Sequence, residues 1–70
     1  MANQTERTIK EQTIDLGRKK FAIALKENHN GKFLRVTEDT VHRRNTVIIP
    51  AEGLAEFLNA IDVVIEGQNL

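Results

Sequence analysis

Apolar and polar residues alternate along much of the first fifty positions of this chain. In the clearest stretch, residues 21–26, the side chains fall on two sides, with Phe21, Ile23 and Leu25 on one and Ala22, Ala24 and Lys26 on the other. Such a period of two is typical of a half-buried β-strand. Weaker forms of the same pattern predict three further strands, over residues 8–16, 32–38 and 46–49.

Short polar segments separate the predicted strands. The segment Asn-His-Asn-Gly at 28–31 predicts a hairpin turn, because Asn and Gly tolerate the positive φ that tight turns require. Gly17 predicts a turn before the second strand, and residues 39–43 predict a polar connection before the fourth. Pro50 ends the fourth strand, since it has no N–H to donate to a neighbouring strand.

The apolar pattern changes its period after Pro50. Apolar side chains now recur at spacings of three and four, at Leu54, Phe57, Leu58, Ile61, Val64 and Ile65. This stripe predicts an amphipathic helix, for which Gly67 is a plausible end. The chain is therefore predicted to be an α+β protein, a four-stranded antiparallel sheet followed by one C-terminal helix. One helix can cover one face of such a sheet and leaves the other face to solvent or a ligand.

The alternation also predicts which side chains share a face. The face for the helix receives Phe21, Ile23, Leu25, Leu34, Val36, Val47 and Ile49. The opposite face receives small, cationic and aromatic residues, namely Ala22, Ala24, Lys26, Phe33, Arg35, Thr37, Arg44, Thr46 and Ile48. Small residues let an extended ligand lie flat, cations meet phosphates, and an exposed aromatic ring stacks on a base. This pattern indicates binding of single-stranded nucleic acid.

Charge is distributed unevenly, although the formal net charge is zero. Residues 1–17 carry −1, residues 18–44 carry +5 and residues 45–70 carry −4. Such asymmetry indicates one surface that attracts anions.

Size and composition exclude several classes of protein. A domain of 70 residues has a marginal core, and without cysteine it has neither disulfides nor thiolate metal sites, so self-association is expected. His29 and His42 are too few to hold a metal, and no cofactor is expected. The common nucleophiles Ser and Cys are missing, and an acid–base cluster of Glu38, Asp39 and His42 has no cleft around it, so we expect no enzyme.

No segment resembles a membrane span or a signal peptide, so a cytoplasmic protein, one that could associate with the nucleoid, is expected. Residues 1–7 are predicted to be a polar tail and residues 8–67 a single domain.

Two interpretations of the exposed sheet face remain open at this point. Phe33 could stack on a base, or it could lie in the contact between two subunits, since exposed aromatic residues often mark protein interfaces. The Lys and Arg side chains could likewise be an ordinary solvated surface that keeps the strands from aggregating.

Residues 17–65 resemble the PUR repeat of the Pur-alpha family and its shorter bacterial relatives. The strongest part is 25–36, Leu-Lys-Glu-Asn-His-Asn-Gly-Lys-Phe-Leu-Arg-Val, which is similar to the strand–hairpin–strand signature of the family. The basic pair Arg43-Arg44 before the fourth strand and Ala55-Glu56-Phe57 in the helix also resemble it. The sequence departs from the signature at Asn30, where the family often has a basic residue.

This resemblance implies a whirly-like fold in which two repeats intertwine and exchange helices, so that a chain with one repeat forms a homodimer. It implies nucleic-acid contacts for Lys26 and Asn28, and base stacking for Phe33 beside the basic Lys32. It also implies a contact for Arg44, the face assignment adds Arg35, and Lys32 of the hairpin signature is a further basic candidate for nucleic-acid contacts. The leading hypothesis is therefore a homodimer that binds single-stranded DNA or RNA and regulates transcription or translation. The alternative is a protein-interaction or dimerisation module that binds no nucleic acid.

Overall fold

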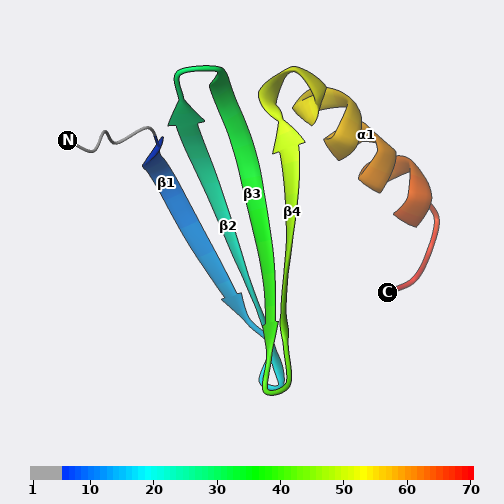
Figure 1. Ribbon diagram of the computed structural model, residues 1–70. Coiled ribbons are helices and arrows are strands. Elements are labelled where there is room, and N and C mark those ends of the chain that lie inside the picture. Colours follow the sequence, from blue (N-terminus) through cyan, green and yellow to red (C-terminus); the bar gives the residue numbers. More distant parts are fainter. Residues whose placement is uncertain (1–5) are drawn as a thin grey trace.

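The chain folds into one open antiparallel sheet with a helix at its end. The computed structural model describes residues 6–70. Its elements are β1 (Glu6–Asp15), β2 (Lys19–Asn28), β3 (Gly31–Thr40), β4 (Arg44–Pro50), a 3₁₀ turn η1 (Ala51–Gly53) and α1 (Leu54–Ile65). The strands pair in chain order, β1-β2-β3-β4 (Figure 1). The predicted α+β fold is confirmed. Most of the predicted tail, residues 1–7, lies outside the described residues.

The strands extend further than the apolar pattern predicted. The bounds predicted for the connection, 39–43, are wrong, because β3 continues to Thr40 and β4 begins at Arg44. The connection consists of residues 41–43. Asp39 pairs in register with Lys20 of β2 and with Arg44 of β4, so polar side chains prolong the sheet. The backbone N–H of Thr40 then donates to the carbonyl of Arg43 at 2.9 Å and closes a tight turn.

The turn between β2 and β3 forms where it was predicted, but its backbone conformation differs from the expected one. Only glycines have positive φ among the described residues, and in this turn that residue is Gly31, at +132°. The expectation that Asn supplies positive φ is therefore wrong. Asn28 acts through its side chain instead: its Oδ1 accepts a hydrogen bond of 2.8 Å from the backbone N–H of Asn30. This Asx turn, together with the positive φ of Gly31, reverses the chain without positive φ at either Asn.

The strand register confirms the two predicted faces. Ile23 pairs with Val36, which pairs with Val47, and Leu25 pairs with Leu34, which pairs with Ile49. These residues, with Phe21 and Ile14, form the face that we call the apolar face. On the other side Ala24 pairs with Arg35, which pairs with Ile48, and Lys26 pairs with Phe33. We call this second side the polar face.

A bulge in β1 changes which of its side chains reach the polar face. The register shifts at Ile9, between Thr8 and Lys10. Strict alternation from Ile14 would place Thr8 and Glu6 on the apolar face. Because a shift of one residue reverses the sides, they lie on the polar face, where Thr8 pairs with Lys26.

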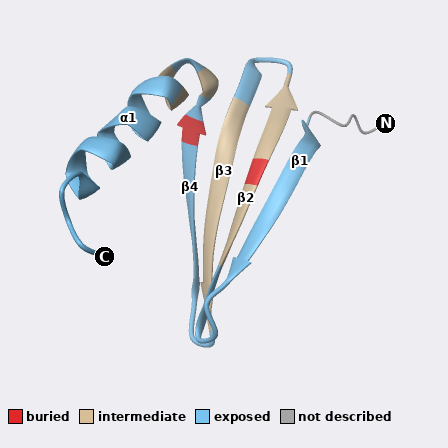
Figure 2. Ribbon diagram, turned by 180° about the vertical axis from the view of Figure 1, so that it is seen from behind, coloured by how far each residue is buried: buried red, intermediate tan, exposed pale blue. Residues whose placement is uncertain are grey.

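The helix does not cover the apolar face of its own chain, contrary to expectation. In Figure 1, α1 leaves the end of β4 and runs apart from the sheet, and among residues 6–70 its only substantial contacts are with η1. The side chains of its stripe are therefore exposed, with Ile61 43% and Leu58 58% accessible. Only Ala24 and Ile49 are buried among the described residues, as Figure 2 shows. Between residues 6 and 70 no helix is long and apolar enough to cross a membrane.

Candidate nucleic-acid interface

The polar face contains a hollow beside Phe33, which we call the Phe33 hollow. It has a volume of about 570 Å³. Its lining includes Phe33 and Arg35 from β3, Thr46, Ile48 and Pro50 from β4, and Asn28 and Asn30 from the turn. Phe33 is half-buried and lies between Lys26 and Pro50 in the register, so part of its ring is open to a ligand. The hollow therefore combines an aromatic surface with amides and a cation at its rim.

A second hollow continues along the same face, and we call it the Ala24 hollow. It has a volume of about 300 Å³, and its lining includes Ala22, Ala24, Lys26, Thr37 and Arg44. Arg35 lines both hollows. Small side chains on β2 make this part of the face low, so an extended strand could pass from one hollow to the other across Arg35.

Lys26 is held against β1 on this face. Its Nζ donates to Oγ1 of Thr8 at 2.7 Å and lies 3.3 Å from Oε2 of Glu6. The side chain of Lys26 is only 16% exposed, so its ammonium has a fixed position. The bulge at Ile9 creates this arrangement, because it turns both partners toward the polar face.

The two arginines of the face differ in their surroundings. Nη2 of Arg44 lies 3.4 Å from Oδ2 of Asp39, its register partner. Arg35 has no carboxylate partner within residues 6–70, so its guanidinium is available to an incoming phosphate. Because Arg35 lies between the two hollows, it is placed to contact the backbone of a bound strand.

The sites predicted from the sequence do not all gather on one face. Lys26, Phe33, Arg35 and Arg44 share the polar face, and Asn28 lines the Phe33 hollow at its end. Lys32 is different: it pairs with Glu27, and this register places it on the apolar face. It also contributes to the lining of the Phe33 hollow, which it reaches at the turn, where β3 begins. Lys32 therefore stands at the margin of the site.

Comparison with known proteins agrees with this geometry. Residues 1–69 match the model of the family described as "PurA ssDNA and RNA-binding protein". The chain belongs to this PurA family.

Curated members of the family resemble the chain over a short part of their length. Transcription factor Pur-alpha 1 of Arabidopsis thaliana is 32% identical over 57 residues, which are 81% of this chain and 19% of that protein. Transcriptional activator plp-1 of Caenorhabditis elegans is 39% identical over 52 residues, 70% of this chain and 23% of that protein. Transcriptional activator protein Pur-alpha of Mus musculus is 32% identical over 72 residues, which cover 91% of this chain and 22% of that protein. The chain thus spans about a fifth of the length of these relatives. No solved structure matches it significantly.

Sequence reasoning missed several residues of the polar face, among them Lys20, Glu6 and Glu11. Lys20 lines the Ala24 hollow, and counting back in twos from Ala24 would have placed it there. Glu6 lines the Phe33 hollow and contacts Lys26. The sequence carries no comparable signal for Glu6, because its side depends on the bulge at Ile9.

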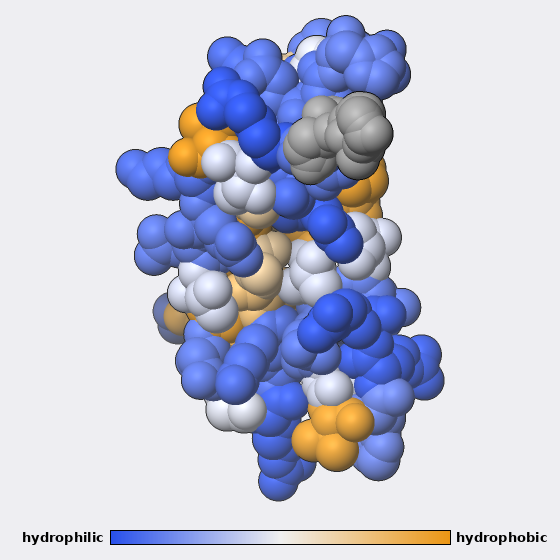
Figure 3. Space-filling model, turned by 60° about the vertical axis from the view of Figure 1, so that its left-hand side comes forward, coloured by the Kyte–Doolittle hydropathy of each residue, from blue (hydrophilic) through white to orange (hydrophobic). Residues whose placement is uncertain are grey.

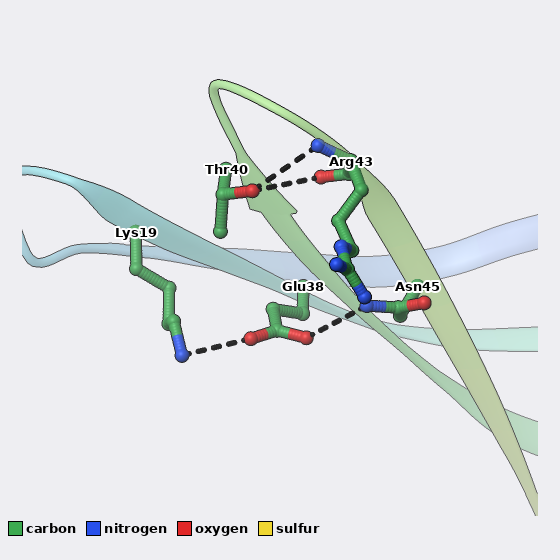
Figure 4. Close-up of polar contacts among 5 residues, drawn as sticks. All are labelled: Lys19, Glu38, Thr40, Arg43 and Asn45. Atoms are coloured by element: carbon green, nitrogen blue, oxygen red, sulfur yellow. Dashed lines mark hydrogen bonds and ion pairs between the residues drawn. The ribbon is translucent and has the colours of Figure 1, made fainter.

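A separate polar row crosses the apolar face near the other end of the strands (Figure 4). Nζ of Lys19 lies 2.8 Å from Oε2 of Glu38, and Nδ2 of Asn45 donates to Oε1 of Glu38 at 3.1 Å. The hydrogen bond from Lys19, then that from Asn45 and the nearby positive charges, hold the pKa of Glu38 below its usual value. Because Glu38 and its neighbour Asp39 lie on opposite faces, the acid–base cluster considered from the sequence is not assembled. Within residues 6–70 no group of three metal-binding side chains occurs either.

Proposed function

We propose that this chain binds single-stranded DNA or RNA on its polar face and does so as a homodimer. Phe33 carries the proposal: a half-buried aromatic ring lies on the polar side of the sheet, in a hollow large enough for a base, beside Arg35, which has no carboxylate partner among residues 6–70. Membership of the PurA family supports the same chemistry. Bases stack on Phe33, Arg35 and Lys26 contact phosphates, and Arg44 extends the cationic surface over β4.

The homodimer is supported by the unpartnered apolar surfaces. In the single chain most of the α1 stripe is exposed, and most of the apolar face of the sheet is half-buried; between residues 6 and 70, Ile49 is the only residue of that face that is buried. An exposed apolar surface of this extent requires a partner. A second copy offers the complementary surface for each, because its helix can cover the apolar face while its sheet receives the helix. The polar face stays free in such an arrangement.

The second candidate function is a protein-interaction module without nucleic-acid binding. The exposed stripe of α1 is the observation that favours it, since amphipathic helices also dock onto other proteins. In this alternative the cations of the polar face only maintain solubility.

A titration of Phe33 variants distinguishes the two functions. Purified protein is titrated against fluorescent single-stranded DNA and RNA at two salt concentrations. Phe33→Leu keeps an apolar side chain but removes the stacking surface, and should weaken binding by roughly 1–3 kcal/mol per stacked base. Phe33→Trp should retain binding, and sedimentation should show an unchanged dimer for both variants. A folded wild-type dimer that binds no oligonucleotide at low salt would reject the nucleic-acid function.

We propose that the protein regulates transcription or translation and catalyses no reaction. Proteins that hold single strands act on transcription or translation by occupying exposed segments, and the relatives are named as transcription factors or activators. For the location we propose the cytoplasm, where binding of single strands would allow association with the nucleoid. Fractionation with and without nuclease treatment tests it.

A further inference from the structure

We propose that carboxylates along the β1 side of the polar face select single strands by repelling the second strand of a duplex. This inference rests on the proposed function and adds a determinant of specificity to it. The cations of the face lie on β2, β3 and β4, and we call the strip of the polar face over these three strands the lane. Acidic residues border the lane. We call the set formed by Glu6, Glu11 and Asp15 the β1 border.

The strand register places these charges. Lys20, Lys26, Arg35 and Arg44 are the lysines and arginines of the polar face, and all four lie on β2–β4. The β1 border pairs with β2 residues of the same face, Glu11 with Ala24 and Asp15 with Lys20. Asp39, beside Arg44, is a further carboxylate of this face. The polar face therefore holds as many carboxylates as cations, which is unusual for a surface that binds a polyanion.

Hollows and ion pairs show that the border is close to the path of a ligand. Glu11 lines the Ala24 hollow together with Lys26 and Arg35. Glu6 lines the Phe33 hollow and contacts Lys26 at 3.3 Å. Figure 3, which brings the β1 side of the molecule forward, shows a largely hydrophilic surface there.

A further carboxylate lies where β4 ends. Residues 45–70 contain no Lys or Arg and four acidic residues. One of them, Glu52 in η1, lines the Phe33 hollow directly after β4. A polyanion on the polar face therefore meets carboxylates along β1 and one more at the end of β4, where η1 contacts β3.

Dimensions explain why a duplex is affected more than a single strand. Neighbouring strands are about 4.8 Å apart, so β2–β4 span about 10 Å and the whole sheet about 14 Å. One row of phosphates fits over this lane. A duplex brings a second row at roughly a groove width, about 6–12 Å away. Where that row falls over the β1 border, like charges repel it, whereas a flexible single strand keeps its phosphates over the cations.

Substitution of Glu11 provides the test, because this residue lines the lane without an ion pair among the described residues. Glu6 is less suitable, since its removal also releases Lys26. Affinities of wild type, Glu11→Gln and Glu11→Lys are measured for one single-stranded oligonucleotide and for its blunt duplex at low salt. Glu66→Gln and Glu66→Lys, beyond α1, serve as controls with the same change of charge.

Duplex affinity should rise roughly threefold for Glu11→Gln and tenfold for Glu11→Lys, and single-strand affinity less than twofold. The Glu66 variants should change neither. Equal gains for single strand and duplex, or the same gains in the Glu66 variants, would overturn the inference while leaving the proposed function intact. A wild-type protein that binds no single strand would overturn the proposed function, and the inference with it.

Discussion

Lys26 and Glu6 meet on the polar face, with Nζ of the lysine 3.3 Å from Oε2 of the glutamate. This contact joins a residue of the hairpin signature to a residue at the start of β1, 20 positions earlier. The ammonium is thereby held over the sheet, but it already has an anionic partner. A phosphate that binds Lys26 must therefore share it with Glu6 or displace the carboxylate. We therefore expect this competition to lower the affinity of the face for nucleic acid.

Glu6→Gln should accordingly tighten the binding of a single strand. The amide keeps the shape of the side chain and removes the competing charge, so we expect the Kd at low salt to fall roughly two- to fivefold, the usual range for one partly exposed ion pair. The difference should shrink as salt increases, because salt screens exposed charges. Fluorescence anisotropy at three salt concentrations measures it.

Glu27→Gln is the matched control for this change. Glu27 also belongs to an ion pair, with Arg7 at 2.8 Å, but that pair lies on the apolar face. A tightening of the same size in Glu27→Gln would mean that overall charge, and not competition for Lys26, controls affinity.

Much of this architecture was predictable because strand and helix periods are local properties of a sequence. The alternation Phe21, Ile23, Leu25 against Ala22, Ala24, Lys26 assigned both faces correctly, since each side chain of a regular strand follows from its neighbour. The same reasoning fails at β1. A bulge at Ile9 moves the side chains of Glu6 and Thr8 from the apolar face to the polar face. The local sequence pattern does not indicate this bulge.

The position of the helix was beyond local reasoning for another reason. Periodicity shows that the stripe of α1 must be covered, but not whether the covering sheet belongs to the same chain. A short connection, η1, leads the helix away from its own apolar face. The family resemblance anticipated exchange of helices, whereas the apolar pattern alone suggested a helix packed on its own sheet.

The homodimer can be tested through Ile61, which lies in the middle of the α1 stripe and is 43% exposed in the single chain. Ile61→Glu should dissociate the dimer, because it places a charge where an apolar side chain is expected to be buried. Loss of that burial alone costs about 1.5–3 kcal/mol per side chain. Analytical ultracentrifugation should show a monomer, and the monomer should unfold at a lower temperature than the wild-type dimer.

Asn59→Glu is the control for Ile61→Glu, because Asn59 falls on the side of the helix opposite the stripe. It should leave the dimer and its thermal stability unchanged. If Ile61→Glu remained a dimer of wild-type stability, the α1 stripe would not be part of the contact between subunits.

The polar row at Glu38 predicts how stability depends on pH. In the folded protein, the pKa of Glu38 is lowered below its ordinary value of 4.5, first by the hydrogen bond from Lys19. A carboxyl group with a lower pKa in the folded state stabilises the protein above its unfolded-state pKa, and this contribution is lost as the pH falls through the folded-state pKa. Glu38 should therefore stabilise the fold at neutral pH and cease to do so in the acidic range below about pH 4.5.

Glu38→Gln separates this contribution from that of other carboxylates. The amide oxygen can still accept a hydrogen bond, but it carries no charge for Lys19, so the urea midpoint should be lower than that of wild type at pH 7. The two midpoints should converge as the pH falls below about 4.5, since wild-type Glu38 is then protonated as well. A difference between the proteins that stays constant from neutral to acidic pH would show that the row acts through packing and not through the charge of Glu38.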